Sequence, residues 1–268
     1  MLNNYNFLRP SLVERSLIST LAKRDISARY KNSLIGIVWS FAHPLFMLVI
    51  YTFVFQYIFK AKWGGTQEVN ASFASILFSG LIIHMLFAEV ISRSTTVIVG
   101  NVNYVKKIVF PLETLCWSLI LSSLVQFACG LGILFLFLLV SGSPVHAGII
   151  AIPLVMLPMV IMLVGLSYLL AALTVFIRDL EQVIHVMVTV VLFTSTVFFP
   201  LDMVPSIIAP LIKVNPITIP VEAVRSLVFD ISPLNYKDLA IYAVVSTVFA
   251  ALSYRLFNFL KPTFADVI

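Results

Sequence analysis

Six long apolar runs constrain this chain more than any other feature of its sequence. A helix needs about 20 mostly apolar residues to cross the hydrocarbon core of a bilayer. The runs lie at residues 36–59, 72–99, 112–140, 148–177, 183–199 and 239–260, and the fifth is the shortest. Each run is continuously apolar, whereas the strands of a membrane barrel alternate over about ten residues. The sequence therefore predicts an all-α integral membrane protein with about six transmembrane helices.

The composition excludes a soluble globular domain. Hydrophobic residues make up 60% of the 268 residues and charged residues only 11%, against roughly 25% charged in an ordinary soluble domain. Too few polar side chains remain to cover such a core in water. The two cysteines, Cys116 and Cys129, lie in apolar runs, which excludes a disulfide framework and a cysteine zinc site. The four histidines are scattered, so we predict no metal site.

The basic residues predict the orientation of the chain and explain its formal net charge of +5. Lys and Arg near span ends stay preferentially on the cytoplasmic side. With a cytoplasmic N-terminus, the inner segments hold Arg9, Arg15, Lys23, Arg24, Arg29, Lys31, Lys106, Lys107, Arg178, Arg255 and Lys261. The outer segments then hold Lys60, Lys62, Lys213, Arg225 and Lys237. We therefore expect both termini in the cytoplasm and no nucleic-acid partner.

These boundaries divide the chain into three parts. We expect a cytoplasmic N-terminal segment at residues 1–35, a transmembrane domain at 36–260 and a cytoplasmic tail at 261–268. The first apolar run begins behind six basic residues and lacks a small-residue cleavage site. We therefore expect no cleavable signal peptide, so that the chain stays whole.

Residues 11–31 predict an amphipathic helix before the first span. Ser11 and Glu14 have the spacing of a capping box, and apolar residues then recur at helical spacing. The basic residues on the other side of this helix are Arg15, Lys23, Arg24 and Arg29. A helix of this kind lies in the membrane interface with its basic face near anionic headgroups. The alternative is a positive-inside anchor with no further role.

Two inner connections have different lengths and different predicted roles. Residues 100–113 join spans two and three and combine a short amphipathic stretch with Lys106 and Lys107, and Pro111 suits the first turn of the next helix. A short cytoplasmic helix here could dock into a partner's groove; the alternative is an ordinary basic loop.

Residues 177–182 form so short a turn that spans four and five must be antiparallel neighbours.

The outer stretch at residues 200–238 is broken by six prolines. The apolar runs between them, 207–212 and 221–229, are far too short to span a bilayer. Irregular backbone is tolerated at membrane depth only where protein or a water-filled cavity satisfies its polar groups. We predict two short re-entrant helices that dip into the outer leaflet and line an exit. The alternative is a folded extracellular cap on the membrane surface.

Two sets of side chains within the spans are candidates for contact with a substrate. Glu89 and Arg93 stand four residues apart on one face of the second span. A lone charge at mid-bilayer costs about 2.5–3.5 kcal/mol, so we expect the two to pair. The pair either touches a polar or anionic substrate or is structural and faces the bundle interior. Tyr51, Phe55 and Phe59 share a face of the first span and either line a glycan path or contact lipid.

No motif in the chain indicates catalysis. The sequence has no GxxxxGKS/T loop for nucleotide, and no HExxH, GxSxG or CxxC motif. A transport function would therefore need energy from a partner. Few carboxylates lie within the spans and no inverted repeat is evident, which argues against a secondary carrier. A membrane-embedded transferase would need a constellation of polar catalytic residues, and we find none.

Four segments together resemble the permease subunits of type-2 ABC exporters. RDISARYKNSLIGIVWSFAHPL (Arg24–Leu45) is similar to the approach to the first span in that family. NVNYVKKIVFPLE (Asn101–Glu113) resembles its coupling segment. FIRDLEQV (Phe176–Val183) and PLDMVPSIIAPLIKVNPITIPVEAVR (Pro200–Arg225) resemble its later signatures. The resemblance extends from about residue 10 to 260 and is closest to the branch that exports O-antigen, capsule or teichoic acid polymers.

The resemblance implies a non-catalytic half-transporter of the bacterial inner membrane. A second copy of the chain would complete a central channel, and two copies of a separate ABC ATPase subunit would dock beneath it. ATP and Mg would bind to that partner, and this chain would hold no cofactor. In the O-antigen branch the cargo is a glycan on undecaprenyl pyrophosphate, taken from among the membrane lipids. A capsule or teichoic acid exporter of the same family is the alternative.

The resemblance also implies roles for particular residues, by matched position. The ATPase coupling segment would comprise Asn101, Val102, Asn103, Tyr104, Val105, Lys106 and Lys107. The interface helix beside the lipid entrance would present Arg15, Lys23, Arg24 and Arg29. The outer re-entrant helices would include Pro205, Pro210, Asn215, Pro216 and Arg225. The candidates for the channel wall are Tyr51, Phe55, Phe59, Glu89 and Arg93, of which Glu89 and Arg93 match no role in the family.

Overall fold

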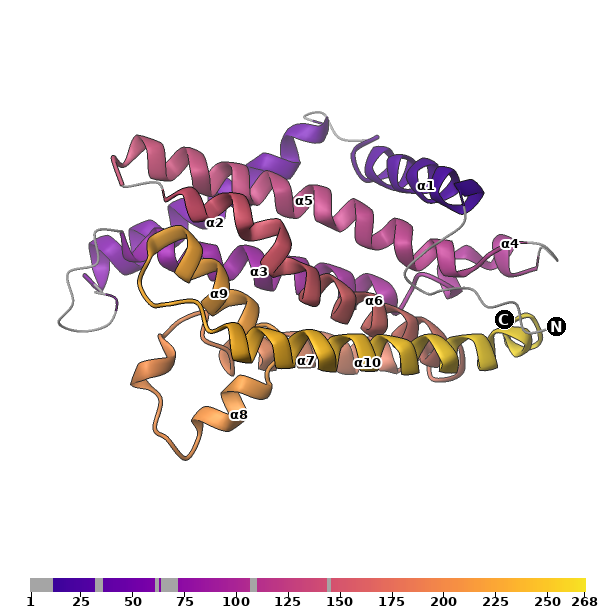
Figure 1. Cartoon of the computed structure of the whole chain (residues 1–268). Helices are drawn as coiled ribbons and strands as arrows, with labels where there is room; N and C mark the ends of the chain where they lie inside the picture. The colour runs from indigo at the N-terminus through magenta and orange to yellow at the C-terminus, as the bar shows by residue number, and fades with distance from the viewer. Residues whose placement is uncertain (1–11, 32–35, 61–62, 64–71, 107–109, 144–145) are drawn as a thin grey trace.

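The computed structural model describes residues 12–31, 36–60, 63, 72–106, 110–143 and 146–268. Within these ranges the chain is helical and contains no β-strand (Figure 1), which confirms the predicted all-α class. The longer helices are α1 (Leu12–Tyr30), α2 (Trp39–Tyr51), α3 (Phe73–Ser94), α5 (Glu113–Val140), α6 (Ile152–Phe176), α7 (Leu180–Phe193), α9 (Thr218–Phe229) and α10 (Tyr236–Leu260). Short helices are α4 (Val102–Val105), α8 (Ala209–Val214) and α11 (Phe264–Val267).

Each of the six predicted apolar runs forms a helix. Among the described residues, four segments are long and apolar enough to cross a bilayer: Phe73–Ser94, Glu113–Val140, Ala147–Phe176 and Tyr236–Val267. Two shorter apolar helices, Trp39–Phe55 and Leu180–Phe193, coincide with the first and fifth runs. The first of these continues through a π-helical segment, Thr52–Ile58. The 14 residues of α7 would extend about 21 Å at 1.5 Å per residue, less than the bilayer core.

Local chemistry fixes several helix ends. The Ser72 hydroxyl accepts a hydrogen bond of 3.3 Å from the backbone N–H of Ala74 and so caps α3. The Asn235 side chain caps α10 in the same way, with a bond of 3.1 Å from the N–H of Asp238. Asp230 has a φ of 52°, the left-handed conformation in which helices commonly end, and it terminates α9. These local features set where α3 and α10 begin and where α9 ends.

Helix α3 is the centre of the bundle. It contacts α2, α5, α6, α7 and α9, and its side chains are buried along most of its length. Helix α10 packs along α6 beside it (Figure 1). The two approach closely at Gly165, where an added Cβ would lie 2.8 Å from the Cα of Ala250. Small residues at such crossings allow the close backbone contact that stabilises helix pairs in membranes.

The two ends of the bundle hold different connections. Helix α4 and the C-terminal α11 lie at one end, whereas α8 and α9 lie toward the other (Figure 1). Helix α1 packs across α5, outside the main bundle. The segments predicted as cytoplasmic therefore gather at one end of the described chain, away from the proline-rich segment predicted as external.

Large apolar side chains remain exposed on several helices. Six large apolar residues on α2, the π-helical segment that follows it, α7 and α10 are each more than half exposed: Phe46, Phe53, Val186, Phe193, Val244 and Leu252. A soluble monomer rarely exposes continuous apolar surface of this kind. Lipid or another membrane-embedded chain would cover these faces.

Candidate functional site

A charged network joins α1, the predicted interface helix, to the centre of the bundle. The Arg93 guanidinium on α3 donates two hydrogen bonds to Asp25 on α1, at 2.6 and 2.7 Å. The Ser122 hydroxyl on α5 donates to the same carboxylate at 2.6 Å. Both bonds from Arg93 come from its Nη2 atom, and hydrogen bonds between charged groups are stronger than those between neutral ones. Three helices therefore meet at Asp25.

Glu89 is held between two arginines of the same network. Arg29 on α1 donates to its Oε1 at 2.5 Å, and Arg93 donates to the same oxygen at 3.3 Å. The side chains of Arg29 and Glu89 are 28% and 19% exposed, so this contact is partly shielded from solvent. The pairing expected between Glu89 and Arg93 is present, but each has a shorter contact with α1. The network balances two carboxylates with two guanidinium groups.

The network also keeps Asp25 ionised. Burial alone would raise the pKa of this carboxyl, but the hydrogen bonds from Arg93 and Ser122 and the positive charges of Arg93 and Arg29 outweigh it. The pKa of Asp25 therefore lies below its ordinary value of 3.8. The carboxylate is charged at every physiological pH, and the contact between α1 and α3 persists with it.

Helix α1 also contacts the predicted coupling segment. Arg24 donates a hydrogen bond to the hydroxyl of Tyr104 on α4, and its guanidinium lies 5.5 Å from the centre of the Tyr104 ring. The Tyr104 ring in turn packs against Phe110, with 4.4 Å between ring centres. A cation over an aromatic face adds to the hydrogen bond. Helix α1 is thereby attached both to α4 and to α3.

The rest of the predicted coupling segment has one buried face and one exposed face. Val105 is buried, and the Asn101 side chain donates to the backbone carbonyl of Val97 at 2.9 Å. Val102 is half-buried, whereas Asn103 and Lys106 are exposed. The short helix expected here is present as α4. Of the predicted coupling residues, Lys107 lies outside the described residues.

The four predicted basic residues of α1 divide into two groups. Arg15 and Lys23 are exposed, as a face toward headgroups requires. Arg24 and Arg29 are exposed as well, but they also contact Tyr104 and Glu89. Helix α1 has nearly the predicted bounds, and the proposed cap at Ser11 lies outside the described residues.

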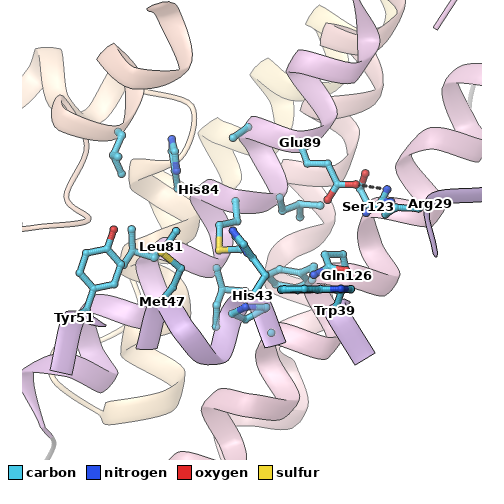
Figure 2. A pocket seen from close by; sticks show the side chains of 18 residues that line it. Arg29, Trp39, His43, Met47, Tyr51, Leu81, His84, Glu89, Ser123 and Gln126 are labelled. Carbon is cyan, nitrogen blue, oxygen red and sulfur yellow. Dashed lines mark hydrogen bonds and ion pairs between the residues drawn. The ribbon is translucent and has the colours of Figure 1, made fainter. Parts of the chain in front are cut away.

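A cavity of about 530 Å³ lies beside the network, between α2, α3 and α5 (Figure 2). Its lining comprises Arg29, Trp39, His43, Pro44, Met47, Tyr51, Leu81, Ile82, His84, Met85, Leu86, Ala88, Glu89, Ser123, Gln126, Phe127, Gly130 and Leu192. The Arg29–Glu89 ion pair and Ser123 lie together on one side of the cavity, whereas Tyr51, Met47 and His84 lie on the other (Figure 2). Of the predicted channel residues, Tyr51 and Glu89 line this cavity.

The aromatic face predicted on the first span is present but points partly into the protein. The ring centres of Tyr51 and Phe55 are 6.2 Å apart, and those of Phe55 and Phe59 are 5.8 Å apart. Phe55 stacks on Phe73 with 5.4 Å between ring centres and also contacts Phe198. Phe59 remains 67% exposed. Phe55 therefore joins the first span to α3 and to the segment after α7.

The proline-rich outer segment contains the two short helices α8 and α9. Pro205 precedes α8, Pro210 occupies its first turn, and Pro216 precedes α9. Between the helices, Asn215 donates to the carbonyl of Val191 and to Thr194, each at 2.9 Å. The predicted break into short helices is thus present, and Asn215 ties the break to the end of α7.

Arg225 on α9 is buried rather than placed at a surface. Only 3% of it is exposed, and it donates hydrogen bonds to the backbone carbonyls of Ile76, Thr196 and Val197. Its guanidinium also lies 4.3 Å from the centre of the Trp63 ring. Two of these carbonyls, those of Thr196 and Val197, lie in the non-helical segment after α7, and the third belongs to α3. Arg225 therefore joins α9, α3 and the end of α7.

Sequence reasoning missed Asp25 and Ser122, which complete the charged network. A signal was present: Asp25 and Arg29 are four residues apart on α1, as Glu89 and Arg93 are on α3. Two such pairs in adjacent helices can exchange partners, and the structure shows that exchange. The proximity of the two helices could not be read from spacing alone.

Comparison with known proteins identifies the family of this chain. The family model of the ABC-2 type transporter matches residues 16–229, a range that contains the charged network, α4, the cavity and α9. The chain belongs to the ABC-2 type transporter family. This ABC-2 transporter chain is therefore a multi-pass membrane permease, and family membership implies an ABC ATPase as its partner.

Relatives of this ABC-2 transporter chain match it almost from end to end. An O-antigen export system permease protein RfbA of Klebsiella pneumoniae is 26% identical over 253 residues, which cover 94% of this chain and 95% of that protein. The RfbA permease of Myxococcus xanthus is 23% identical and covers 95% of this chain and 96% of its own length. The polysialic acid transport protein KpsM of Escherichia coli is 24% identical and covers 91% of this chain and 94% of its own length.

Proposed function

We propose that this chain is the transmembrane half of an ATP-driven exporter that moves a lipid-linked polysaccharide of the O-antigen type across the inner membrane. The observation that carries the proposal is the end-to-end similarity to O-antigen export permeases from two organisms. Similarity over the whole length covers both the inner docking region and the outer proline-rich region. All of these full-length relatives are named as exporters or transporters of a polysaccharide, and O-antigen is the cargo named for the relatives from two organisms.

The membrane arrangement in this proposal has six spans and cytoplasmic termini. Helix α1 lies in the inner interface, and α8 and α9 re-enter from the outside. The grouping of α4 and α11 at one end supports it, as does the ion pair of 2.8 Å between Lys261 and Glu113, which ties the last helix to the start of α5. The excess of basic residues in the inner segments agrees with the positive-inside rule.

In this proposal, α4 is the segment through which the partner ATPase acts on the spans. Two ATPase subunits, which bind ATP and Mg, dock against the exposed side chains of Asn103 and Lys106. A movement of α4 is then transmitted to α1 through the Arg24–Tyr104 contact. From α1 it is transmitted to α3 through the Arg93–Asp25 contact. The spans have two arrangements in this proposal, and the ATP-bound ATPase binds one of them more tightly. ATP binding therefore shifts the equilibrium toward that arrangement.

A second copy of the chain completes the conduit in this proposal. The exposed apolar residues of α2 and α7 support a partner in the membrane, and both helices also contribute to the cavity wall, through Met47 and Leu192. An undecaprenyl-pyrophosphate-linked glycan would pass between the two copies. The chain itself supplies no catalytic residue.

The proposal is tested by deletion of the gene in its native host. We expect loss of surface polysaccharide, measured on whole cells, together with accumulation of lipid-linked polymer inside the cell. The intact gene should restore export, and a gene encoding Lys106→Glu with Lys107→Glu should restore less. Unchanged surface polysaccharide in the deletion strain would contradict the proposal.

A capsule exporter of the same family is the second candidate, and the similarity to KpsM favours it. The same deletion separates the two cargoes. Sugar analysis of the accumulated polymer would match the O-antigen of the host in the first case and its capsule in the second. A teichoic acid polymer would be recognised by its phosphate content.

A further inference from the structure

The cavity between α2, α3 and α5 has the construction of a site for one lipid chain. We propose that it binds a single hydrocarbon chain of a lipid whose phosphate is taken by Arg29. The inference rests on the membrane arrangement of the proposed function but not on the identity of the polymer. Two kinds of lipid share this chemistry, a membrane glycerophospholipid and an isoprenoid phosphate.

The walls of the cavity suit hydrocarbon. Its volume of about 530 Å³ lies within the range of about 300–1,000 Å³ typical of small-molecule sites. Most of the lining is apolar and comes from three helices, for example Met47, Ile82 and Phe127. Along α3 the lining runs from Leu81 to Glu89, which is about 12 Å at 1.5 Å per residue. The apolar part of this wall suits an apolar ligand rather than ordered water.

Two polar side chains of the cavity wall are engaged with the backbone rather than directed at a ligand. His84 is hydrogen-bonded to the backbone carbonyl of Val188 at 3.2 Å, and Gln126 donates to that of Ser40 at 3.0 Å. A sugar site needs several polar groups directed at the ligand, because each buried sugar hydroxyl requires a partner. Two of the polar side chains in this wall are instead engaged with the backbone.

One side of the cavity can hold a phosphate. Arg29 lies in the last turn of α1, and its guanidinium offers the forked donor geometry that phosphate oxygens match. Arg93 also contacts the Glu89 oxygen that Arg29 binds. Glu89 therefore keeps a cationic partner when Arg29 turns to a phosphate. Glu89 is therefore not left as an unpaired carboxylate, which would be unfavourable where it is shielded from solvent.

Ser123 supplies a second donor at the same place. Its hydroxyl is fully buried and lines the cavity beside the Arg29–Glu89 pair (Figure 2). Among the residues that the structure describes, it has no hydrogen-bond partner. A buried hydroxyl without a partner is unfavourable unless a ligand or water satisfies it. A phosphate bound by Arg29 would provide an acceptor for Ser123.

The experiment measures lipid retained by the purified complex of the chain with its ATPase. The complex is placed in nanodiscs that contain either phosphatidylglycerol or phosphatidylethanolamine with added undecaprenyl phosphate, and bound lipid is counted by native mass spectrometry. We expect Ala88→Trp, which fills the cavity, to reduce bound lipid by about tenfold. Val125→Trp, at a position on α5 that is 42% exposed and outside the cavity lining, is the matched control.

The phosphate is tested separately with Arg29→Gln. This variant should retain less phosphate-bearing lipid than the wild type, although the cavity is unchanged. Met85→Trp serves as a second filling variant if Ala88→Trp fails to assemble. Retention of phosphatidylglycerol identifies a membrane lipid as the ligand, and preference for undecaprenyl phosphate identifies the isoprenoid.

Equal lipid retention by the wild type and both filling variants would overturn the proposal. Equal retention by Arg29→Gln would overturn the role of the phosphate. Because the readout is bound lipid rather than polymer at the cell surface, failure of this inference is distinguishable from failure of the proposed function.

Discussion

Removal of Arg93 should destabilise the protein mainly through its contact with Asp25. Arg93→Met removes the guanidinium but keeps much of the side-chain volume. Asp25 then keeps the hydrogen bond from the Ser122 hydroxyl and the nearby positive charge of Arg29. Glu89 is affected less, because it keeps the 2.5 Å contact with Arg29. The network therefore predicts that Asp25, not Glu89, is the residue most strongly coupled to Arg93.

The magnitude follows from the geometry and the exposure of the pair. Exposed ion pairs contribute about 0–1 kcal/mol, and removal of one partner from a fully buried pair costs about 3–5 kcal/mol. The side chains of Arg93 and Asp25 are 33% and 29% exposed, which is intermediate. Hydrogen bonds to charged groups contribute about 1.5–3 kcal/mol. We therefore expect Arg93→Met to lower the free energy of unfolding by about 2–3 kcal/mol.

The assay is a double-mutant cycle measured by unfolding in mixed micelles. Its variants are Arg93→Met, Asp25→Asn and the two combined, with a parallel cycle for Arg93→Met and Glu89→Gln. The coupling energy should be about 1.5–3 kcal/mol for the Asp25 cycle and smaller for the Glu89 cycle. Lys23→Met, at an exposed position on α1, is the control and should change stability by no more than about 0.5 kcal/mol.

Two results would refute this reasoning. A loss for Arg93→Met no larger than that of the Lys23→Met control would show that the network contributes nothing to stability. A larger coupling energy for Glu89 than for Asp25 would show that the pair within α3 dominates, as spacing alone suggests.

Three further predictions concern pH, packing and docking. The pKa of Asp25 is lower in the folded state than its ordinary value of 3.8. The stability that Asp25 contributes is therefore present above that pH and is lost as the pH falls through the folded-state pKa. In Asp25→Asn, the free energy of unfolding should depend less on pH across this acidic range. Gly165→Leu should lower the free energy of unfolding by about 1–3 kcal/mol, because the backbone of α10 already occupies the space. Gly132→Leu, whose Cβ would meet open space, should have little effect in the same assay. Lys106→Glu combined with Lys107→Glu should reduce co-purification of the ATPase, and undiminished capture of the ATPase would exclude α4 as its docking site.

Much of the fold follows from local patterns in the sequence. Apolar runs of about 20 residues can satisfy their backbone in a membrane only as helices, and all six runs are helical. Capping spacing and apolar periodicity at residues 11–31 predict α1 with bounds close to those observed. Prolines between short apolar runs predict the breaks around α8 and α9. Each of these features depends on neighbours within a few residues.

The contacts between helices could not be predicted in the same way. Asp25 and Arg93 are 68 residues apart in the chain, and spacing within one helix does not show which other helix lies beside it. Arg225 was expected in an outer helix, but its burial against the carbonyls after α7 depends on how α9 packs on α3. The cavity likewise exists only because α2, α3 and α5 diverge around it.

Transport by purified components in vesicles tests the central claim most directly. The chain reconstituted alone with ATP and lipid-linked polymer should move no polymer across the bilayer, because it has no nucleotide-binding loop. Addition of the partner ATPase should start polymer translocation that depends on ATP hydrolysis. ATP-driven translocation by the chain alone, or none by the complete complex supplied with the polymer of its own host, would contradict the account.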